Sequence, residues 1–217
     1  MDLYYHPISP PCWSVILLAK QLDLPINLKK VDMFAGEHLK EDFLKLNPQH
    51  SVPTLVDGEF TLSESHAILT YLADAHSGSD EHPLYPRDKK VRAQIHHRLS
   101  FDLDTLYRRF YAFGTPIWTT KTEPSEENRT KLNEALGFLS AYLSRGRFAV
   151  GDSITIADIP LAVSVFCMEM LKFDLSPYPK VQEWYAACKQ ELVGMKSEFM
   201  DNALEEFKKF LEAPKQH

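Results

Sequence analysis

Apolar and polar residues follow strand-like patterns at the start of the chain. Residues 3–5 predict a short strand, and residues 26–31 alternate between apolar and polar side chains, which predicts a second strand with one buried face. Between them, residues 15–24 have the spacing of a helix that ends at Pro25. The opening segment is therefore expected to form a strand–helix–strand unit.

A hairpin and two further helices are expected to complete this region. Residues 41–46 predict a short helix. An Asp-Gly pair separates the apolar runs 54–56 and 60–62, which is a strong hairpin signal. Residues 63–75 return to helical spacing, with these residues on one face: Ile68, Leu69 and Leu72. The predicted order, βαβαββα, is that of a small mixed α/β sheet covered by helices.

The pattern becomes helical after residues 76–86, a polar stretch with Pro and Gly that indicates a linker. One long amphipathic helix is predicted from apolar residues that recur every three or four positions: Val91, Ile95, Leu99, Leu103, Leu106, Phe110 and Phe113. A second helix is predicted from the same spacing: Leu132, Leu136, Leu139 and Leu143. We therefore place an α/β domain at 1–78, a linker at 79–87 and an all-α domain at 88–217.

Three more helices are expected in the second domain. Residues 151–158 open one of them, where Thr155 can cap the helix and Asp158 can reach back, as in a capping box. The segments 181–188 and 203–211 predict the other two from their apolar spacing.

Charge and composition narrow the class of protein. The 24 basic and 30 acidic residues give a net charge of −6, so no basic surplus is available for nucleic acid or an anionic membrane. The apolar stretches are shorter than the roughly 20 residues that a membrane span needs. Three cysteines without framework spacing indicate a reducing, cytoplasmic location. The nine histidines lack zinc-site spacing, so no metal is expected.

Ser9 lies where the first strand is expected to become the first helix. Serine is a good N-cap and proline suits the first helical turn, so a structural role is the simpler interpretation. The same position places a hydroxyl beside helix N–H groups that favour an anion such as a thiolate. Ser9 is therefore a candidate catalytic residue. Cys12 is interpreted as a small buried apolar residue, with a reactive thiol of lowered pKa as the alternative.

Other residues of the first domain suit a peptide-like ligand. Pro53 precedes a strand and is a candidate for a cis bond, which would turn the backbone before it toward an extended peptide. Glu64 and Ser65 open a helix, where they can hold an ammonium and a carboxylate. His38 and His50 lie in loops, where an imidazole can contact a carboxylate or simply face solvent.

Aromatic residues gather late in the long helix, where a role in the helix core is the usual explanation. They cannot all face one side, so part of this surface is expected to line a cleft: Phe101, Tyr107, Phe110, Tyr111, Phe113 and Trp118.

These features together resemble the cytosolic glutathione transferases, most closely the insect delta and epsilon classes, over nearly the whole chain. The matching motifs are LYYHPISPPC, VDMFAGEHLKEDFLKLNPQHSVPTLVDGEFTLSESHAIL, LYPRD and GDSITIADI. The resemblance implies a thioredoxin-like first domain, an all-helical second domain and a homodimer. It also implies an enzyme that conjugates reduced glutathione to hydrophobic electrophiles, as in xenobiotic detoxification.

The resemblance also implies roles for individual residues. Ser9 would hydrogen-bond the glutathione sulfur, and Val52, before the cis-Pro53, would pair with the cysteinyl backbone. The remaining glutathione contacts would come from the two loop histidines, for the glycyl carboxylate, and from the helix start, for the γ-glutamyl end: His38, His50, Glu64, Ser65 and His66. The electrophile pocket would be lined by His6, Pro11, Met33, Tyr107, Phe110, Phe113, Trp118 and Phe207.

Departures from the family pattern leave two alternatives open. Trp13 and His66 stand where arginine is common, and His6 stands where an apolar residue is usual. A neutral imidazole is a weaker carboxylate partner than a guanidinium group, so weaker and more pH-sensitive glutathione binding is expected. A hydrophobic-ligand carrier with little catalysis is one alternative, and a glutathione thiol transferase that depends on Cys12 is the other.

Overall fold

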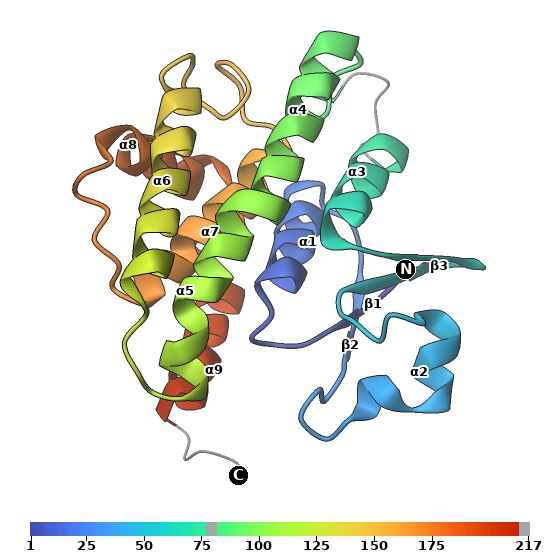
Figure 1. The fold of residues 1–217 in the computed structure, drawn as a ribbon. Coiled ribbons are helices and arrows are strands. Elements are labelled where there is room, and N and C mark those ends of the chain that lie inside the picture. Colours follow the sequence, from blue (N-terminus) through green and yellow to red (C-terminus); the bar gives the residue numbers. More distant parts are fainter. Residues whose placement is uncertain (77–81, 213–217) are drawn as a thin grey trace.

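The computed structural model describes residues 1–76 and 82–212 and has a small sheet beside a larger group of helices (Figure 1). The strands are β1 (Asp2–Tyr5), β2 (Asn27–Lys30), β3 (Thr54–Asp57) and β4 (Phe60–Ser63). The helices are α1 (Pro10–Gln21), α2 (Glu41–Leu46), α3 (Ser65–Ala75), α4 (Lys89–Phe101), α5 (Tyr107–Thr119), α6 (Glu126–Leu143), α7 (Asp158–Met170), α8 (Pro179–Glu191) and α9 (Glu198–Glu212). A 3₁₀ turn, η1 (Glu37–Leu39), precedes α2, and a π-helical segment, η2 (Asp102–Leu106), joins α4 to α5.

The sheet has the strand order β2-β1-β3-β4, with β1 parallel to β2 and antiparallel to β3. Leu3 pairs with Leu28 on one side and with Leu55 on the other. The predicted element order βαβαββα is confirmed. The expected buried face of residues 26–31 is wrong within β2, where all four residues are exposed, whereas the flanking Val31 is buried and Ile26 packs against the core.

Helix α1 connects the two halves of the molecule, because it packs against α3 of the first domain and α7 of the second. It begins at Pro10, five residues before the predicted start, since proline fits the first helical turn. Trp13 is fully buried in this helix, where its Nε1 donates to the Pro7 carbonyl at 2.6 Å and its ring contacts Phe166. The Trp13 ring therefore packs in the hydrophobic core between the two domains.

The predicted long helix is interrupted, because η2 separates α4 from α5. A π turn spans five residues instead of four and so rotates the helix face that follows. Leu103, expected on the buried face, is 48% exposed, and Asp102 is buried in its place. The prediction of one uninterrupted amphipathic helix is wrong at this turn, which brings a carboxylate into the core.

The start of α7 is held by Asp158, whose carboxylate is fully buried. Its Oδ2 accepts from the backbone N and the Oγ1 of Thr155, which confirms that Asp158 reaches back. Its Oδ1 accepts from the Ala149 N and from the Trp184 Nε1, at 2.8 Å each. The expected threonine cap is wrong, because Ala157 is the N-cap residue of α7 and no side chain makes a capping hydrogen bond there. Burial raises the pKa of Asp158 although these donors lower it.

The remaining helices follow the predicted spacing. The apolar face of α6 is buried as expected, and the segments 181–188 and 203–211 lie inside α8 and α9. The predicted boundary between residues 78 and 79 lies outside the described residues, as do 79–81 of the linker and residues 213–217, so the domain limits remain predictions.

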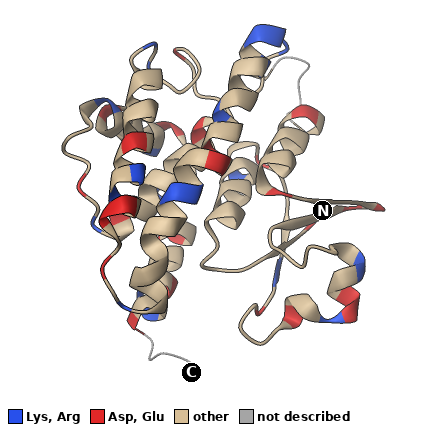
Figure 2. Cartoon of the chain, in the orientation of Figure 1, with Lys and Arg blue, Asp and Glu red and all other residues tan. Residues whose placement is uncertain are grey.

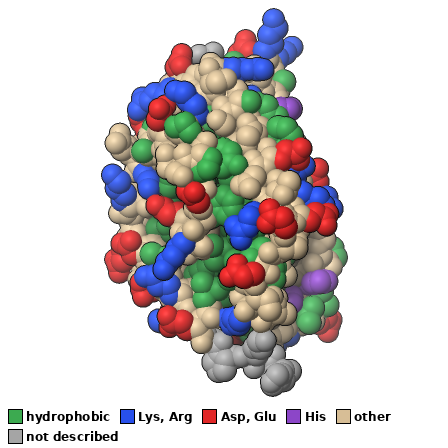
Figure 3. Space-filling model, turned by 60° about the vertical axis from the view of Figure 1, so that its left-hand side comes forward, with side chains coloured by type: hydrophobic (Ala, Val, Ile, Leu, Met, Phe, Trp, Pro, Cys, Tyr) green, Lys and Arg blue, Asp and Glu red, His purple; other side chains and the backbone are tan. Residues whose placement is uncertain are grey.

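The surface carries charges of both signs. Basic and acidic side chains are interspersed along the same helices (Figure 2). On the face shown in Figure 3, apolar side chains form a central band that is flanked by charged residues. Within residues 1–76 and 82–212, no helix is long and apolar enough to cross a membrane.

Candidate active site

Three cavities lie between the sheet domain and the helices, and Tyr107 lines all of them. We name them by their contents: the Ser9 cavity, the Glu64 cavity and the apolar cavity. The Ser9 cavity brings together eight residues that the sequence analysis selected: His6, Ser9, Pro11, Met33, His38, His50, Val52 and Tyr107. Tyr107 therefore lies at the junction of a polar site and an apolar one.

Ser9 occupies the N-cap position of α1, but its side chain makes no capping hydrogen bond. Ser9 therefore occupies the expected N-cap position, but its hydroxyl accepts no hydrogen bond from the helix backbone. The next two residues, Pro10 and Pro11, have no N–H group, so the helix start offers fewer backbone donors to an anion than expected. The Ser9 hydroxyl therefore remains as a side-chain donor at this helix start.

Cys12 is fully buried one turn into α1. Burial raises the pKa of its thiol to about 12, and the smaller effects of the Ser9 side chain and the His6 backbone only partly oppose this rise. The thiol is therefore protonated at neutral pH, which agrees with the interpretation of Cys12 as a buried apolar residue.

The two loop histidines lie together in the Ser9 cavity. The His38 and His50 ring centroids are 6.0 Å apart. His38 Nδ1 is buried and has no hydrogen-bond partner among the described residues. His50 has a φ of 46°, a conformation that costs energy for a residue other than glycine and that is often found at functional sites. An unpaired buried nitrogen suits a ligand that supplies the missing hydrogen bond.

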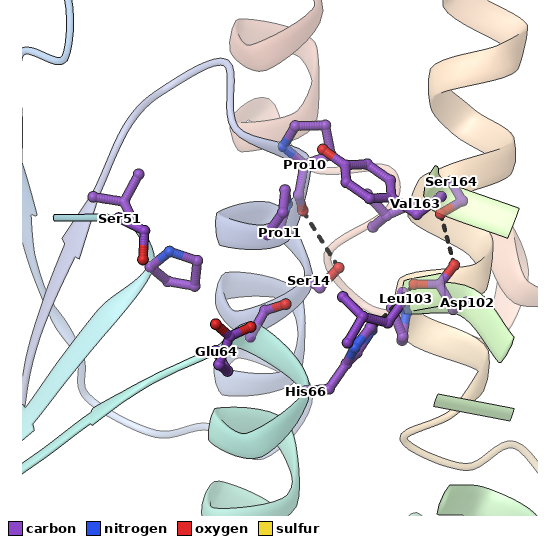
Figure 4. A pocket seen from close by; sticks show the side chains of 15 residues that line it. Pro10, Pro11, Ser14, Ser51, Glu64, His66, Asp102, Leu103, Val163 and Ser164 are labelled. Carbon is purple, nitrogen blue, oxygen red and sulfur yellow. Dashed lines mark hydrogen bonds and ion pairs between the residues drawn. The ribbon is translucent and has the colours of Figure 1, made fainter. Parts of the chain in front are cut away.

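The Glu64 cavity lies at the start of α3 (Figure 4). Glu64 precedes the helix with a φ of 70°, and Ser65 begins it. Val52 and Pro53 line the same cavity, and the predicted cis bond between them is confirmed. The structure therefore places a carboxylate, a hydroxyl and the backbone of the cis Val52–Pro53 pair around one cavity.

His66 points from α3 toward Asp102 of the second domain (Figure 4). Its Nε2 lies 3.1 Å from Asp102 Oδ2, and the Ser164 Oγ donates to the other carboxylate oxygen at 2.7 Å. Asp102 and Ser164 were missing from the sequence analysis, because only the π turn places that carboxylate inside. His66 thus joins the two domains while it also lines the cavity.

The apolar cavity has a volume of about 160 Å³. An apolar cavity of about 150 Å³ accepts benzene, so there is room for one aromatic ring. Four residues expected in the electrophile pocket line it: Tyr107, Phe110, Trp118 and Phe207. Tyr111, one of the aromatic residues from which a cleft lining was expected, lines it as well, together with four residues that were not selected: Ile8, Pro10, Cys167 and Phe210. Helical spacing was the available signal, since Tyr111 follows Tyr107 by four residues and Phe210 follows Phe207 by three.

Three expected pocket residues lie in the Ser9 cavity instead: His6, Pro11 and Met33. Phe113 is 4% exposed, and its ring packs edge-on against Phe173 at 5.2 Å. Its expected place in the electrophile pocket is therefore corrected to a place in the core.

Comparisons with known proteins agree with this arrangement. The family model of the glutathione S-transferase N-terminal domain matches residues 3–80, and that of the C-terminal domain matches residues 94–191. The chain is 46% identical to glutathione S-transferase D7 of Anopheles gambiae over 192 residues, which are 88% of this chain and 87% of the relative.

The chain belongs to the glutathione transferase family.

Solved structures place this transferase among insect members of the family. A delta-class glutathione transferase of Nilaparvata lugens is 41% identical, with a TM-score of 0.91 over 97% of this chain and 98% of that one. A glutathione transferase homologue of Drosophila mojavensis, solved with bound glutathione, is 28% identical, with a TM-score of 0.84 over 97% and 94%. The thioredoxin-like first domain and the helical second domain are thus the fold of the family.

Metal binding is a separate question for this transferase. Within residues 1–76 and 82–212, no group of three or more His, Cys, Asp or Glu side chains is placed to hold a metal ion. The expectation of an enzyme without metal remains a prediction.

Proposed function

We propose that this transferase conjugates reduced glutathione to apolar electrophiles and that Ser9 holds the glutathione sulfur as a thiolate. The observation that carries the proposal is the Ser9 hydroxyl, which is free of a capping bond in a cavity that shares Tyr107 with the apolar cavity. A thiol bound beside Ser9 would face an electrophile bound beside Phe110.

The chemical step needs a negatively charged sulfur and a fixed approach. The Ser9 hydroxyl donates a hydrogen bond to the thiolate, which favours the charged form and lowers the pKa of the bound thiol. The thiol proton passes to water, and the sulfur then attacks the electrophilic carbon and forms a carbon–sulfur bond. In a substitution, the leaving group departs with the electron pair of the broken bond, whereas in an addition to an isothiocyanate a carbon–nitrogen π bond breaks and the nitrogen takes up a proton. Holding both reactants in adjoining cavities lowers the entropic part of the barrier.

Glutathione would extend across the two polar cavities. Its γ-glutamyl end would lie at Glu64 and Ser65, and its cysteinyl backbone would pair with Val52 beside Pro53. Its glycyl carboxylate would accept from His38 and His50, which gives the buried His38 Nδ1 a partner. The bound glutathione of the Drosophila mojavensis homologue supports the same ligand here.

Several residues would define the electrophile side. The apolar cavity offers aromatic surfaces and room for one ring, which suits flat apolar electrophiles: Tyr107, Phe110, Tyr111, Trp118 and Phe207. A thiol transferase that depends on Cys12 is disfavoured, because the Cys12 thiol remains protonated near neutral pH and the thiolate is the reactive form.

The proposal also covers the oligomeric state of the protein and its location in the cell. We propose a cytoplasmic homodimer, and light scattering would then give the mass of two 24.9 kDa chains. We propose no metal and no nucleic-acid or membrane partner.

Ser9→Ala tests the proposal. A hydrogen bond to a charged group contributes about 1.5–3 kcal/mol, so we expect kcat to fall about 10- to 100-fold. The thiolate absorbance of bound glutathione should also appear at higher pH in the variant. Ultraviolet difference spectra and initial rates with 1-chloro-2,4-dinitrobenzene measure both effects.

Ser125→Ala is the matched control. Ser125 caps α6, where its Oγ accepts from the Asn128 N at 3.2 Å, away from the three cavities. The control should lose about 1 kcal/mol of unfolding free energy and keep the thiolate spectrum. Wild-type activity in Ser9→Ala would remove the role of Ser9, and glutathione binding without thiolate formation would favour a carrier.

A further inference from the structure

Phe34 is an exposed aromatic residue beside the Ser9 cavity. It follows the lining residue Met33, and 63% of its surface is exposed. Two hydrogen bonds order its loop: Asp32 Oδ1 accepts from the Ala35 N at 2.9 Å, and the Asp32 N donates to Glu37 Oε2 at 2.7 Å. A single exposed apolar ring is ordinary on a protein surface, so its contacts decide whether it has a role.

The ring of Phe34 contacts one ring from each cavity. It lies edge-on to His6 at a centroid distance of 5.3 Å and stacks on Phe210 of α9 at 5.8 Å, with an interplanar angle of 21°. Both distances are within the range of favourable aromatic pairs. His6 lines the Ser9 cavity and Phe210 lines the apolar cavity. A row of rings therefore crosses from one domain to the other between the two cavities.

Helix α9 extends this row. Phe210 lies 6.2 Å from Phe207, which is 8% exposed and lines the apolar cavity as well. Next to it, the carbonyl of Leu211 accepts a hydrogen bond from Lys121 Nζ, from the segment that follows α5. The end of α9 is therefore held against the pocket, and Phe210 is presented to Phe34.

We propose that Phe34 is a specificity-determining residue of the electrophile site, and that Phe34 and Phe210 form an aromatic wall that selects flat aromatic electrophiles. The proposal rests on the proposed function and names the substrate class of that site. Aromatic rings favour offset-stacked or edge-on neighbours. A flat electrophile can join the row of rings, whereas a compact aliphatic electrophile gains no such contact.

The expected effect is moderate. One aromatic pair changes an equilibrium roughly two- to tenfold. Loss of the Phe34 ring should therefore lower kcat/KM for a flat aromatic electrophile by that factor. The KM for glutathione should stay the same, because Phe34 lies outside its proposed contacts.

The experiment compares two electrophiles in four variants. Phe34→Leu, Phe210→Leu and the double variant remove one or both rings and keep apolar bulk. Phe138→Leu is the control, because Phe138 is another exposed phenylalanine, 42% exposed, on α6. The electrophiles are 1-chloro-2,4-dinitrobenzene and the aliphatic allyl isothiocyanate. The ratio of their kcat/KM values measures the selection, and thermal unfolding checks the fold.

If the aromatic wall selects flat electrophiles, each single variant should lower the ratio of the two kcat/KM values two- to tenfold. The double variant should lower this ratio little further, and Phe138→Leu should leave it unchanged. An unchanged ratio, an equal loss for both electrophiles, or multiplying losses in the double variant would overturn the proposal. If the wild type conjugates neither electrophile, the proposed function fails and the wall is tested by fluorescence titration with anilinonaphthalene sulfonate. An unchanged Kd in Phe34→Leu, or no binding to the wild type, would then overturn it.

Discussion

The Ser9 cavity and the apolar cavity share Tyr107, but they draw their other residues from the chain in different ways. The polar residues of the first come from loops and a helix start of the first domain, and short motifs place them. The apolar cavity collects side chains from the start of α1 and the residue Ile8 before it, and from α5, α7 and α9. Its composition therefore depends on how these helices pack against one another.

The largest expected effect concerns the three buried thiols, which occur in both domains. Burial raises the pKa of Cys12 from 9.0 to about 12 and also raises the pKa values of Cys167 and Cys188. Unfolded thiols ionise at lower pH than these folded ones. The free energy of unfolding should therefore fall as pH rises above about 9, by about 1.4 kcal/mol per pH unit for each thiol.

Denaturant unfolding at a series of alkaline pH values measures this slope. Cys12→Ala should reduce it by the contribution of one thiol. A slope that Cys12→Ala leaves unchanged would mean that Cys12 ionises as easily in the folded protein, and the thiol transferase alternative would return.

The next largest expected effect distinguishes two phenylalanines that lie one turn apart on α5. Phe110 lines the apolar cavity, whereas Phe113 packs in the core. We expect Phe110→Leu to raise the KM for 1-chloro-2,4-dinitrobenzene roughly two- to tenfold, because an aromatic contact is lost. Phe113→Leu should keep that KM and lower the unfolding free energy by about 1 kcal/mol. Equal KM values in the two variants would contradict the difference between pocket and core.

The smallest effect concerns His66, where the polar region meets the helices. The Nε2 of His66 lies 3.1 Å from Asp102 Oδ2, so this imidazole nitrogen is already engaged. A guanidinium group is always charged and offers five N–H donors, so it can contact Asp102 and a glutathione carboxylate at the same time. We therefore expect His66→Arg to bind glutathione a few-fold more tightly than the wild type.

Calorimetric titration of both proteins with glutathione at one pH measures this difference. An equal or weaker affinity of His66→Arg would show that His66 does not limit glutathione binding.

The elements that the sequence predicted well have local causes. The hairpin follows from Asp-Gly, and Gly58 has the positive φ that such a turn uses. Ser9, His38, His50, Val52 and Glu64 were selected from motifs in turns or at helix starts, and the structure gathers them around two polar cavities. The edge position of β2 was not predictable, because alternation is the same in an edge strand and a central one.

Turn residues and hydrophobic periodicity act over a few positions, so they were sufficient to predict the element order of the first domain, the helical second domain and the polar residues near Ser9. Packing in three dimensions was needed to place Asp102 inside and Leu103 outside, to bury Phe113 in the core, and to bring Phe34 against Phe210. The first outcome depends on one π turn, and the others depend on packing between segments far apart in the chain. Contacts of this kind leave no periodic trace in a single sequence.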